Sequence, residues 1–307
     1  MCAYRIVALF MALGIAGEVF AQTPDEAPAL SVDVNRVMVY ATVRQSNGNF
    51  VADLEKKDFT VLEDGKAQEL LSFTREDVPV AIGLLVDNSR SMINKRNEVV
   101  EAAKAFVRVT NPGDEIFVLH FNEKLTYGLP KDTAFTSDHA LLDAALDQMK
   151  LDGRTALYDA IQEGLQHLNR STLTKKALIV LSDGGDNISF LNDDIVVKMA
   201  DLSGALFYGI GIYDPLDGDA DPGVLRDLAK RTGGEAYFPK ALTEVRQLCE
   251  TIAATLRNQY ALSYSPKLDT PGRDYRKLEV KVRDPKRRKL TIRTRTGYYV
   301  SKLDEQK

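Results

Sequence analysis

The chain has 307 residues, of which 44% are hydrophobic and 27% are charged, and its formal net charge is −4. This composition is typical of a globular protein with enough apolar material for two cores, so we expect two domains. The net negative charge argues against nucleic acid as the partner.

Residues 1–21 have the pattern of a signal peptide. The first five residues carry a positive charge, residues 6–17 are almost wholly apolar, and Ala21 is a small residue at a plausible cleavage point. We therefore predict an exported protein, either periplasmic or secreted. The apolar segment is short for a bilayer and no other run reaches about 18 apolar residues, so we expect no membrane span after signal cleavage. Cleavage would leave Cys249 unpaired, and we interpret it as a small core hydrophobe.

Both ends of the remaining chain are typical of β-structure. Residues 30–73 alternate apolar and polar side chains, with the tight-turn pairs Asn47-Gly48 and Asp64-Gly65, and a similar alternation returns in residues 259–300. Each end alone is too small to bury a core. We predict that residues 28–78 and 258–301 together form an immunoglobulin-like β-sandwich, with the basic run at 286–289 in a solvated hairpin turn.

The middle of the chain, residues 79–257, alternates buried strands with amphipathic helices. Continuous apolar runs predict parallel strands buried on both faces, at 79–87, 115–121, 176–183 and 204–212. Apolar residues at helical spacing predict helices at 97–109, 139–149, 156–168, 193–202, 223–232 and 241–259. This alternation predicts an α/β fold: a Rossmann-like, doubly wound, mostly parallel sheet, inserted in the β-sandwich that the N- and C-terminal segments form.

Oxygen-bearing side chains stand where these strands end. The first strand ends at Asp87, and Ser89 and Ser91 follow it; Thr155 opens a helix, and Asp183 ends the third strand. Ligands of open parallel sheets bind beyond the carboxyl ends of the strands, so we expect these five residues to gather there. A set without histidine or cysteine favours a hard divalent cation, Mg²⁺ best, with Mn²⁺ or Ca²⁺ as alternatives. Neutral hydroxyl ligands would leave the ion attractive to a carboxylate of another protein.

The pattern D-x-S-x-S in DNSRS, the Thr in GRTALYDA and the Asp in LSDGG resemble the von Willebrand factor type A domain and its metal ion-dependent adhesion site, over residues 79–257. The resemblance implies a Rossmann-like fold, metal-dependent protein binding and usually no catalysis. The flanking segments are similar to those of exported bacterial proteins related to this family. Many family members have Gly where Arg90 stands; its guanidinium can either assist an acidic partner or compete for Asp87 and Asp183.

Other polar residues favour structural interpretations. Asp87, Ser89 and Ser91 alone are equally consistent with a helix cap, and it is Thr155 and Asp183 that favour a metal site. The acidic loop at 214–223 has calcium-loop spacing but lacks the required glycine and glutamate, so we interpret it as solvated.

The three histidines share no pattern with carboxylates, and we interpret them as structural; they are His120, His139 and His167. Neither a G-x-S-x-G elbow nor a phosphate-binding glycine motif is present, so we do not expect an enzyme.

The favoured hypothesis is an exported adhesion or scaffolding module that captures an Asp or Glu of a partner protein through Mg²⁺. The alternatives are a metal-dependent hydrolase of phosphoesters and a purely structural envelope protein. Because the family that the sequence resembles can couple its metal-site loops to movement of the last helix, the resemblance implies that the helix at 241–259, which runs directly into the sandwich, would transmit ligand binding to it.

Overall fold

The computed structural model describes residues 36–75, 77–148, 150–183, 185–213, 222–266, 275–286 and 288–299. The predicted signal peptide and residues 214–221 of the acidic loop lie outside the described residues. The described residues all belong to one compact unit, so the proposed boundaries between the α/β domain and the sandwich stay predictions. Among the helices described, none is long and apolar enough to cross a membrane.

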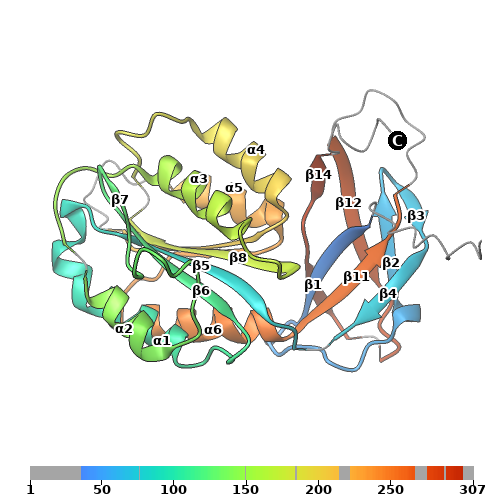
Figure 1. Ribbon diagram of the computed structural model, residues 1–307. Coiled ribbons are helices and arrows are strands. Elements are labelled where there is room, and N and C mark those ends of the chain that lie inside the picture. The colour runs from blue at the N-terminus through green and yellow to red at the C-terminus, as the bar shows by residue number, and fades with distance from the viewer. Residues whose placement is uncertain are drawn as a thin grey trace, which may run out of the picture. The chain divides into compact units, whose positions relative to one another are not determined.

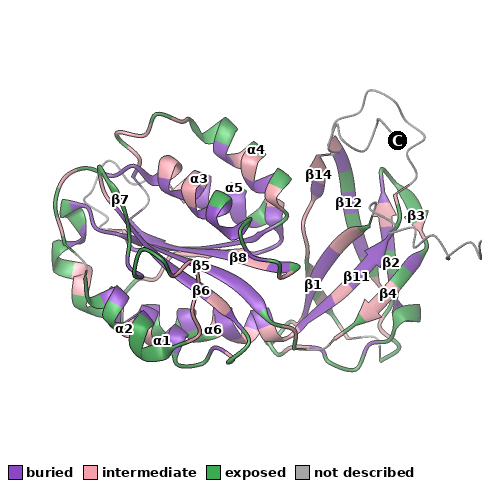
Figure 2. Ribbon diagram, in the orientation of Figure 1, coloured by how far each residue is buried: buried purple, intermediate pink, exposed green. Residues whose placement is uncertain are grey.

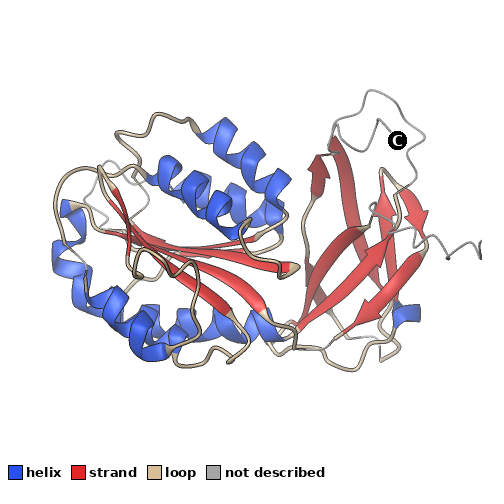
Figure 3. Ribbon diagram, in the orientation of Figure 1, coloured by secondary structure: helices blue, strands red, loops and turns tan. Residues whose placement is uncertain are grey.

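A six-stranded sheet forms the centre of the α/β part (Figures 1 and 3). Its four long parallel strands are those predicted: β5 (Val80–Asp87), β6 (Glu115–Phe121), β8 (Lys175–Ser182) and β9 (Leu206–Gly211). Two edge strands were not predicted, namely the antiparallel β7 (Leu125–Tyr127) and the parallel β10 (Glu235–Tyr237). Each has only three residues, which is too short to show a periodic pattern.

Helices cover both faces of this sheet, as the alternation predicted (Figure 1). On one face lie α1 (Arg96–Val107), α2 (His139–Asp147) and α6 (Val245–Arg257). On the other lie α3 (Leu157–Leu168), α4 (Asp193–Ser203) and α5 (Pro222–Thr232). Short 3₁₀ turns, η2 (Arg90–Lys95) and η3 (Leu242–Glu244), lead into α1 and α6.

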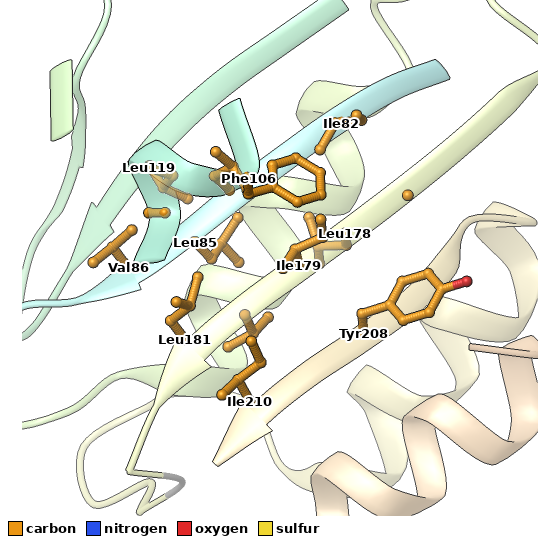
Figure 4. Packing of buried hydrophobic residues seen from close by; sticks show 14 of the residues in the cluster. Ile82, Leu85, Val86, Phe106, Leu119, Leu178, Ile179, Leu181, Tyr208 and Ile210 are labelled. Atoms are coloured by element: carbon orange, nitrogen blue, oxygen red, sulfur yellow. The ribbon is translucent and has the colours of Figure 1, made fainter. Parts of the chain in front are cut away.

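Because helices pack on both faces, β5 is buried from end to end and β8 is buried at every residue except Lys176 (Figure 2). Figure 4 shows the resulting core, in which side chains of β5, β6, β8 and β9 pack with Phe106 of α1. The packing is close at Gly83, where an added Cβ would lie 2.6 Å from the Phe117 ring and 2.7 Å from Leu178. Cys249 belongs to this core, and burial raises the pKa of its thiol to about 12, in agreement with its interpretation as a hydrophobe.

The strand order of the sheet is β10-β9-β8-β5-β6-β7. The chain therefore extends the sheet from β5 toward β6 and then returns to add β8 on the other side of β5. This reversal makes the carboxyl ends of β5 and β8 the topological switch point, where open α/β sheets bind their ligands. Asp87 ends β5, and Asp183 directly follows β8.

The two ends of the chain form a β-sandwich, as predicted. One antiparallel sheet has the order β13 (Leu290–Arg293), β1 (Val37–Gln45), β11 (Gln259–Tyr264) and β4 (Leu70–Thr74). The other has the order β14 (Gly297–Tyr299), β12 (Tyr275–Val282), β2 (Phe59–Glu63) and β3 (Lys66–Gln68). A 3₁₀ turn, η1 (Lys56–Asp58), precedes β2. Each sheet combines strands from both ends of the chain, and the two sheets share one apolar core.

The turns of the sandwich confirm one prediction and correct another. Asp64 and Gly65 both have positive φ, 48° and 82°, and form the two-residue turn of the β2–β3 hairpin. The basic run does not form a hairpin turn, because β12 and β13 belong to different sheets. Its Arg288 instead pairs with Asp53 and Asp284. Alternation predicted the strands but could not specify their partners.

Candidate metal centre

Three loops meet at the switch point, and backbone hydrogen bonds join them. The amide of Asn88 donates to Phe121 O (2.7 Å), which holds the loop after β5 against the end of β6. The amide of Asp152 donates to Asn88 O (3.0 Å), and that of Arg90 donates to Gly153 O (3.2 Å). The loop before α3 is therefore fixed directly to the D-x-S-x-S segment.

The third loop, after β8, is joined to the loop before α3 at Thr155. The Thr155 amide donates to Asn187 Oδ1 (3.0 Å), and the Asn187 amide donates back to Thr155 O (3.1 Å). Thr155 itself is buried. This reciprocal pair joins Thr155 to the segment that follows Asp183, and the side chain of Asn187 makes one of its two hydrogen bonds.

Asp87 is fully buried and held at both carboxylate oxygens. Oδ1 accepts from the Ser89 amide (2.8 Å), and Oδ2 accepts from Ser182 Oγ (2.6 Å). Burial, and secondly the neighbouring Asp183 carboxylate, raise the pKa of Asp87 to about 7 against the smaller opposing effect of these hydrogen bonds. Two carboxylates that repel each other in a buried position create a site that a cation would stabilise.

Ser89 and Ser91 bring their hydroxyl groups together, with 3.0 Å between the two Oγ atoms. The two hydroxyls are hydrogen-bonded to each other. Neighbouring oxygens in an octahedral shell with Mg–O distances of about 2.0–2.1 Å lie about 2.8–3.0 Å apart, so the two hydroxyls are close enough to be neighbouring ligands of one ion.

The alternative that the D-x-S-x-S residues cap the next helix is wrong. Ser89 is the N-cap of η2 but makes no side-chain capping bond, and the N-cap of α1 is Lys95. The Asp87 carboxylate accepts from its own loop and from β8 instead. These polar side chains therefore face one another rather than the helix end.

Sequence reasoning missed a cation within this centre. Lys95 Nζ lies 3.4 Å from Asp183 Oδ2, and the two side chains are only 12% and 5% exposed. Arg90, which the sequence suggested as a possible competitor for Asp87 and Asp183, pairs instead with Asp152 (3.3 Å), and both of these side chains are exposed. Spacing could not single out Lys95, because the geometry of η2 decides which of several charged residues in this segment turns inward.

The histidines lie in other surroundings. His120 Nε2 is 2.8 Å from Ala145 O, and His167 Nε2 is 2.8 Å from Ala134 O. Burial lowers the pKa of both imidazoles. His139 Nε2 is 3.4 Å from Thr110 Oγ1. These contacts agree with structural roles.

The donor set fits a hard ion that keeps water ligands. Within the described residues, no group of three or more His, Cys, Asp or Glu side chains is placed to hold a metal. The centre at the switch point offers two carboxylates and hydroxyl oxygens instead, and Mg²⁺ is usually bound by one or two carboxylates with several waters. The residues present therefore fit Mg²⁺ better than a metal that needs imidazole or thiolate ligands.

This combination defines a class of protein: a doubly wound α/β domain with an oxygen-lined centre at its switch point. Residues 82–185 match the family model of the von Willebrand factor type A domain. The α/β part of the chain is thus a von Willebrand factor type A domain.

Solved structures that are similar to the chain have low sequence identity to it. Proximal thread matrix protein 1 from the mussel byssus is 17% identical, with a TM-score of 0.53 over 64% of this chain and 50% of that chain. Its structure is described with zinc in a metal ion-dependent adhesion site (MIDAS) motif. The von Willebrand factor type A protein from Catenulispora acidiphila is 13% identical, with a TM-score of 0.51 over 88% of this chain and 75% of that chain. The corresponding domain of the type V pili tip protein Mfa5 from Porphyromonas gingivalis is 13% identical, with a TM-score of 0.47 over 59% and 95%. The comparison with curated protein sequences gave no match.

Proposed function

We propose that this chain is an exported, Mg²⁺-dependent protein-binding module that captures an Asp or Glu side chain of a partner protein, in an adhesive or scaffolding role. Asp87, Ser89, Ser91, Thr155 and Asp183 would hold the ion. When bound, the ion would supply a Lewis-acid centre with a coordination position for the partner's carboxylate. The protein acts by binding rather than by catalysis.

The observation that carries the proposal is the 3.0 Å spacing of the Ser89 and Ser91 hydroxyls beside two buried carboxylates. Hydroxyl ligands leave more of the ion's charge available to an incoming anion than carboxylates would. The mussel byssus protein, which shares the fold, holds zinc in a motif of the kind that this sequence resembles, and this supports a divalent metal at the same place.

Exposed apolar side chains near the centre favour a protein partner. Ile93 follows Ser91 by two residues and is 52% exposed, and Phe190, on the loop after β8, is 99% exposed. The Phe190 amide donates to Asp159 Oδ2 (3.1 Å), which fixes the loop one helical turn beyond Thr155. Exposed aromatic side chains are typical anchors of protein interfaces.

The export part of the proposal depends on the sequence of residues 1–21, which has the pattern of a cleaved signal peptide. Fractionation of cells that express the chain tests it. Recovery of a shortened protein in the periplasm or the medium is expected, and an uncleaved protein in the cytoplasm would contradict it.

Calorimetric titration with Mg²⁺ and with Mn²⁺ tests the metal centre. Saturable binding to one site is expected for the wild type, with at least about 100-fold weaker binding for Asp183→Asn, since even changes outside the ligand shell typically cost about 10–100-fold. Asp132→Asn removes an exposed carboxylate elsewhere and serves as the matched control. Absence of saturable binding by the wild type would reject the function.

Partner capture is tested on envelope extract with the wild type, Asp183→Asn and Phe190→Ser. A protein retained in Mg²⁺ should be released by chelator and lost from the Asp183 variant. The Phe190 variant should bind the metal normally but retain less of the partner. Retention that is equal in Mg²⁺ and in chelator would refute metal-dependent capture.

A further inference from the structure

We infer that Lys95 is an internal cation that competes with the divalent ion for Asp183, so that it weakens the metal affinity of the site and speeds metal exchange. This inference rests on the proposed function, because it concerns the regulation of the same centre. It assigns to this chain a residue that lies outside the D-x-S-x-S, Thr and Asp pattern.

The position of Lys95 is the first observation. Its Nζ lies 3.4 Å from Asp183 Oδ2, and the side chains are 12% and 5% exposed, so water screens the pair only weakly. Charge-assisted N–H···O bonds are usually about 2.7–2.9 Å long. The longer distance describes a loose ion pair, which a divalent cation with several ligands can displace.

The second observation concerns the local structure at Lys95, which is the last residue of η2 and the N-cap of α1. Its side chain makes no capping bond with α1, and the favoured N-cap residues are Ser, Thr, Asp and Asn. The side chain instead reaches across the centre to Asp183.

The neighbouring charges are arranged so that this one lysine faces the carboxylates. Arg90 is held at the exposed Asp152. Lys104, further along α1, is held at Asp147 with an N–O distance of 2.7 Å. Of the cations for which the described residues show an ion pair in this region, Lys95 is the one that reaches a candidate ligand.

Charge competition has a measurable consequence. A positive charge within about 4–6 Å of a carboxylate typically weakens its hold on a second cation by about tenfold or more. Replacing Lys95 by Met keeps an unbranched side chain of similar length and removes the charge. We expect Lys95→Met to bind Mn²⁺ at least about tenfold more tightly than the wild type, with slower dissociation.

Calorimetric titration of the full chain with Mn²⁺ makes the test, on the wild type and on Lys95→Met, Lys95→Arg and Lys104→Met. Lys104 has a side-chain exposure of 14%, close to that of Lys95, and lies on the same helix segment, so Lys104→Met is a matched control for the loss of a lysine. The Arg variant keeps the positive charge and should bind Mn²⁺ much as the wild type does. Circular dichroism confirms that each variant is folded.

The outcomes separate this inference from the function on which it rests. Tighter binding by Lys95→Met alone supports the inference. If the wild type binds Mn²⁺ and Lys95→Met binds no more tightly, or if Lys95→Arg gains as much as Lys95→Met, the inference is overturned and the proposed function stands. If neither the wild type nor any variant binds Mn²⁺, the proposed function fails and the inference fails with it.

Discussion

Lys175 is a buried lysine whose charge should make the stability of the fold depend on pH. It is the first residue of β8 and is only 4% exposed. Its Nζ donates to Leu256 O (2.5 Å) and lies 5.2 Å from the centre of the Tyr40 ring. Burial, with a further contribution from Arg257, lowers the pKa of Lys175 from 10.5 to about 8.

The size of the effect follows from the two pKa values. Each pKa unit corresponds to about 1.4 kcal/mol, so the lowering from 10.5 to about 8 amounts to about 3 kcal/mol. Below about pH 8 both states carry the proton, and the folded state bears the full cost of the buried charge. Between about pH 8 and 10.5 the unfolded state binds more protons than the folded state, so this group makes stability rise with pH. Above 10.5 the cost is absent.

Lys175→Met should remove this pH dependence. The variant loses the hydrogen bond to Leu256 O, which costs about 1–3 kcal/mol at any pH. The free energy of unfolding of the variant minus that of the wild type should therefore be about 2–3 kcal/mol more positive at pH 7 than at pH 10, which means that the variant is relatively more stable at pH 7. The measurement is urea denaturation of both proteins at the two pH values.

Lys131→Met is the control, because it removes an exposed lysine, and its effect on stability should be equal at pH 7 and pH 10. The reasoning is refuted if Lys175→Met changes the free energy of unfolding by the same amount at both pH values. Such a result would mean that the lysine is charged equally easily in the folded and unfolded states.

Three further substitutions test the candidate centre and the core. Ser182→Ala removes the 2.6 Å hydrogen bond to a candidate ligand carboxylate and should lower Mn²⁺ affinity about 10–100-fold in calorimetry; an unchanged affinity would show that the bond does not orient the ligand. Glu63→Leu removes the carboxylate that pairs with buried Arg276 and accepts from two tyrosine hydroxyls, and it should reduce the free energy of unfolding by about 3–5 kcal/mol in urea; a loss below about 1 kcal/mol would contradict the importance of this pair. Gly83→Ala forces a Cβ to within 2.6 Å of Phe117 and should cost about 1–3 kcal/mol in thermal or urea unfolding; wild-type stability would show that the core relaxes freely.

The glutamate pair also shows how the sandwich is held together. Glu63 of β2 accepts hydrogen bonds from Tyr264 of β11 (2.5 Å) and Tyr298 of β14 (2.8 Å), and it pairs with Arg276 of β12. One residue of the N-terminal segment thus binds three strands of the C-terminal segment. Alternation in the sequence predicted these strands, but the buried charge at their centre gave no periodic signal.

The amino-acid sequence by itself determined the class of the fold and the chemistry of the candidate centre. The apolar runs of β5, β6, β8 and β9 and the helical spacing between them specify a doubly wound sheet, because buried parallel strands and amphipathic helices have distinct periods. The oxygen-bearing residues at the strand ends follow from the same local pattern. The pattern did not predict the short edge strands β7 and β10, because three residues are too few to show a period.

Only the tertiary structure decided which side chains meet. The inward turn of Lys95 onto Asp183, the exchange of hydrogen bonds between Thr155 and Asn187, and the assignment of β12 and β13 to different sheets all join residues that are separate in the chain. The periodicity of a segment indicates which of its faces is apolar. Which other segment packs against that face depends on the strand order and on the free energy of packing the whole chain, and neither can be predicted from a local pattern.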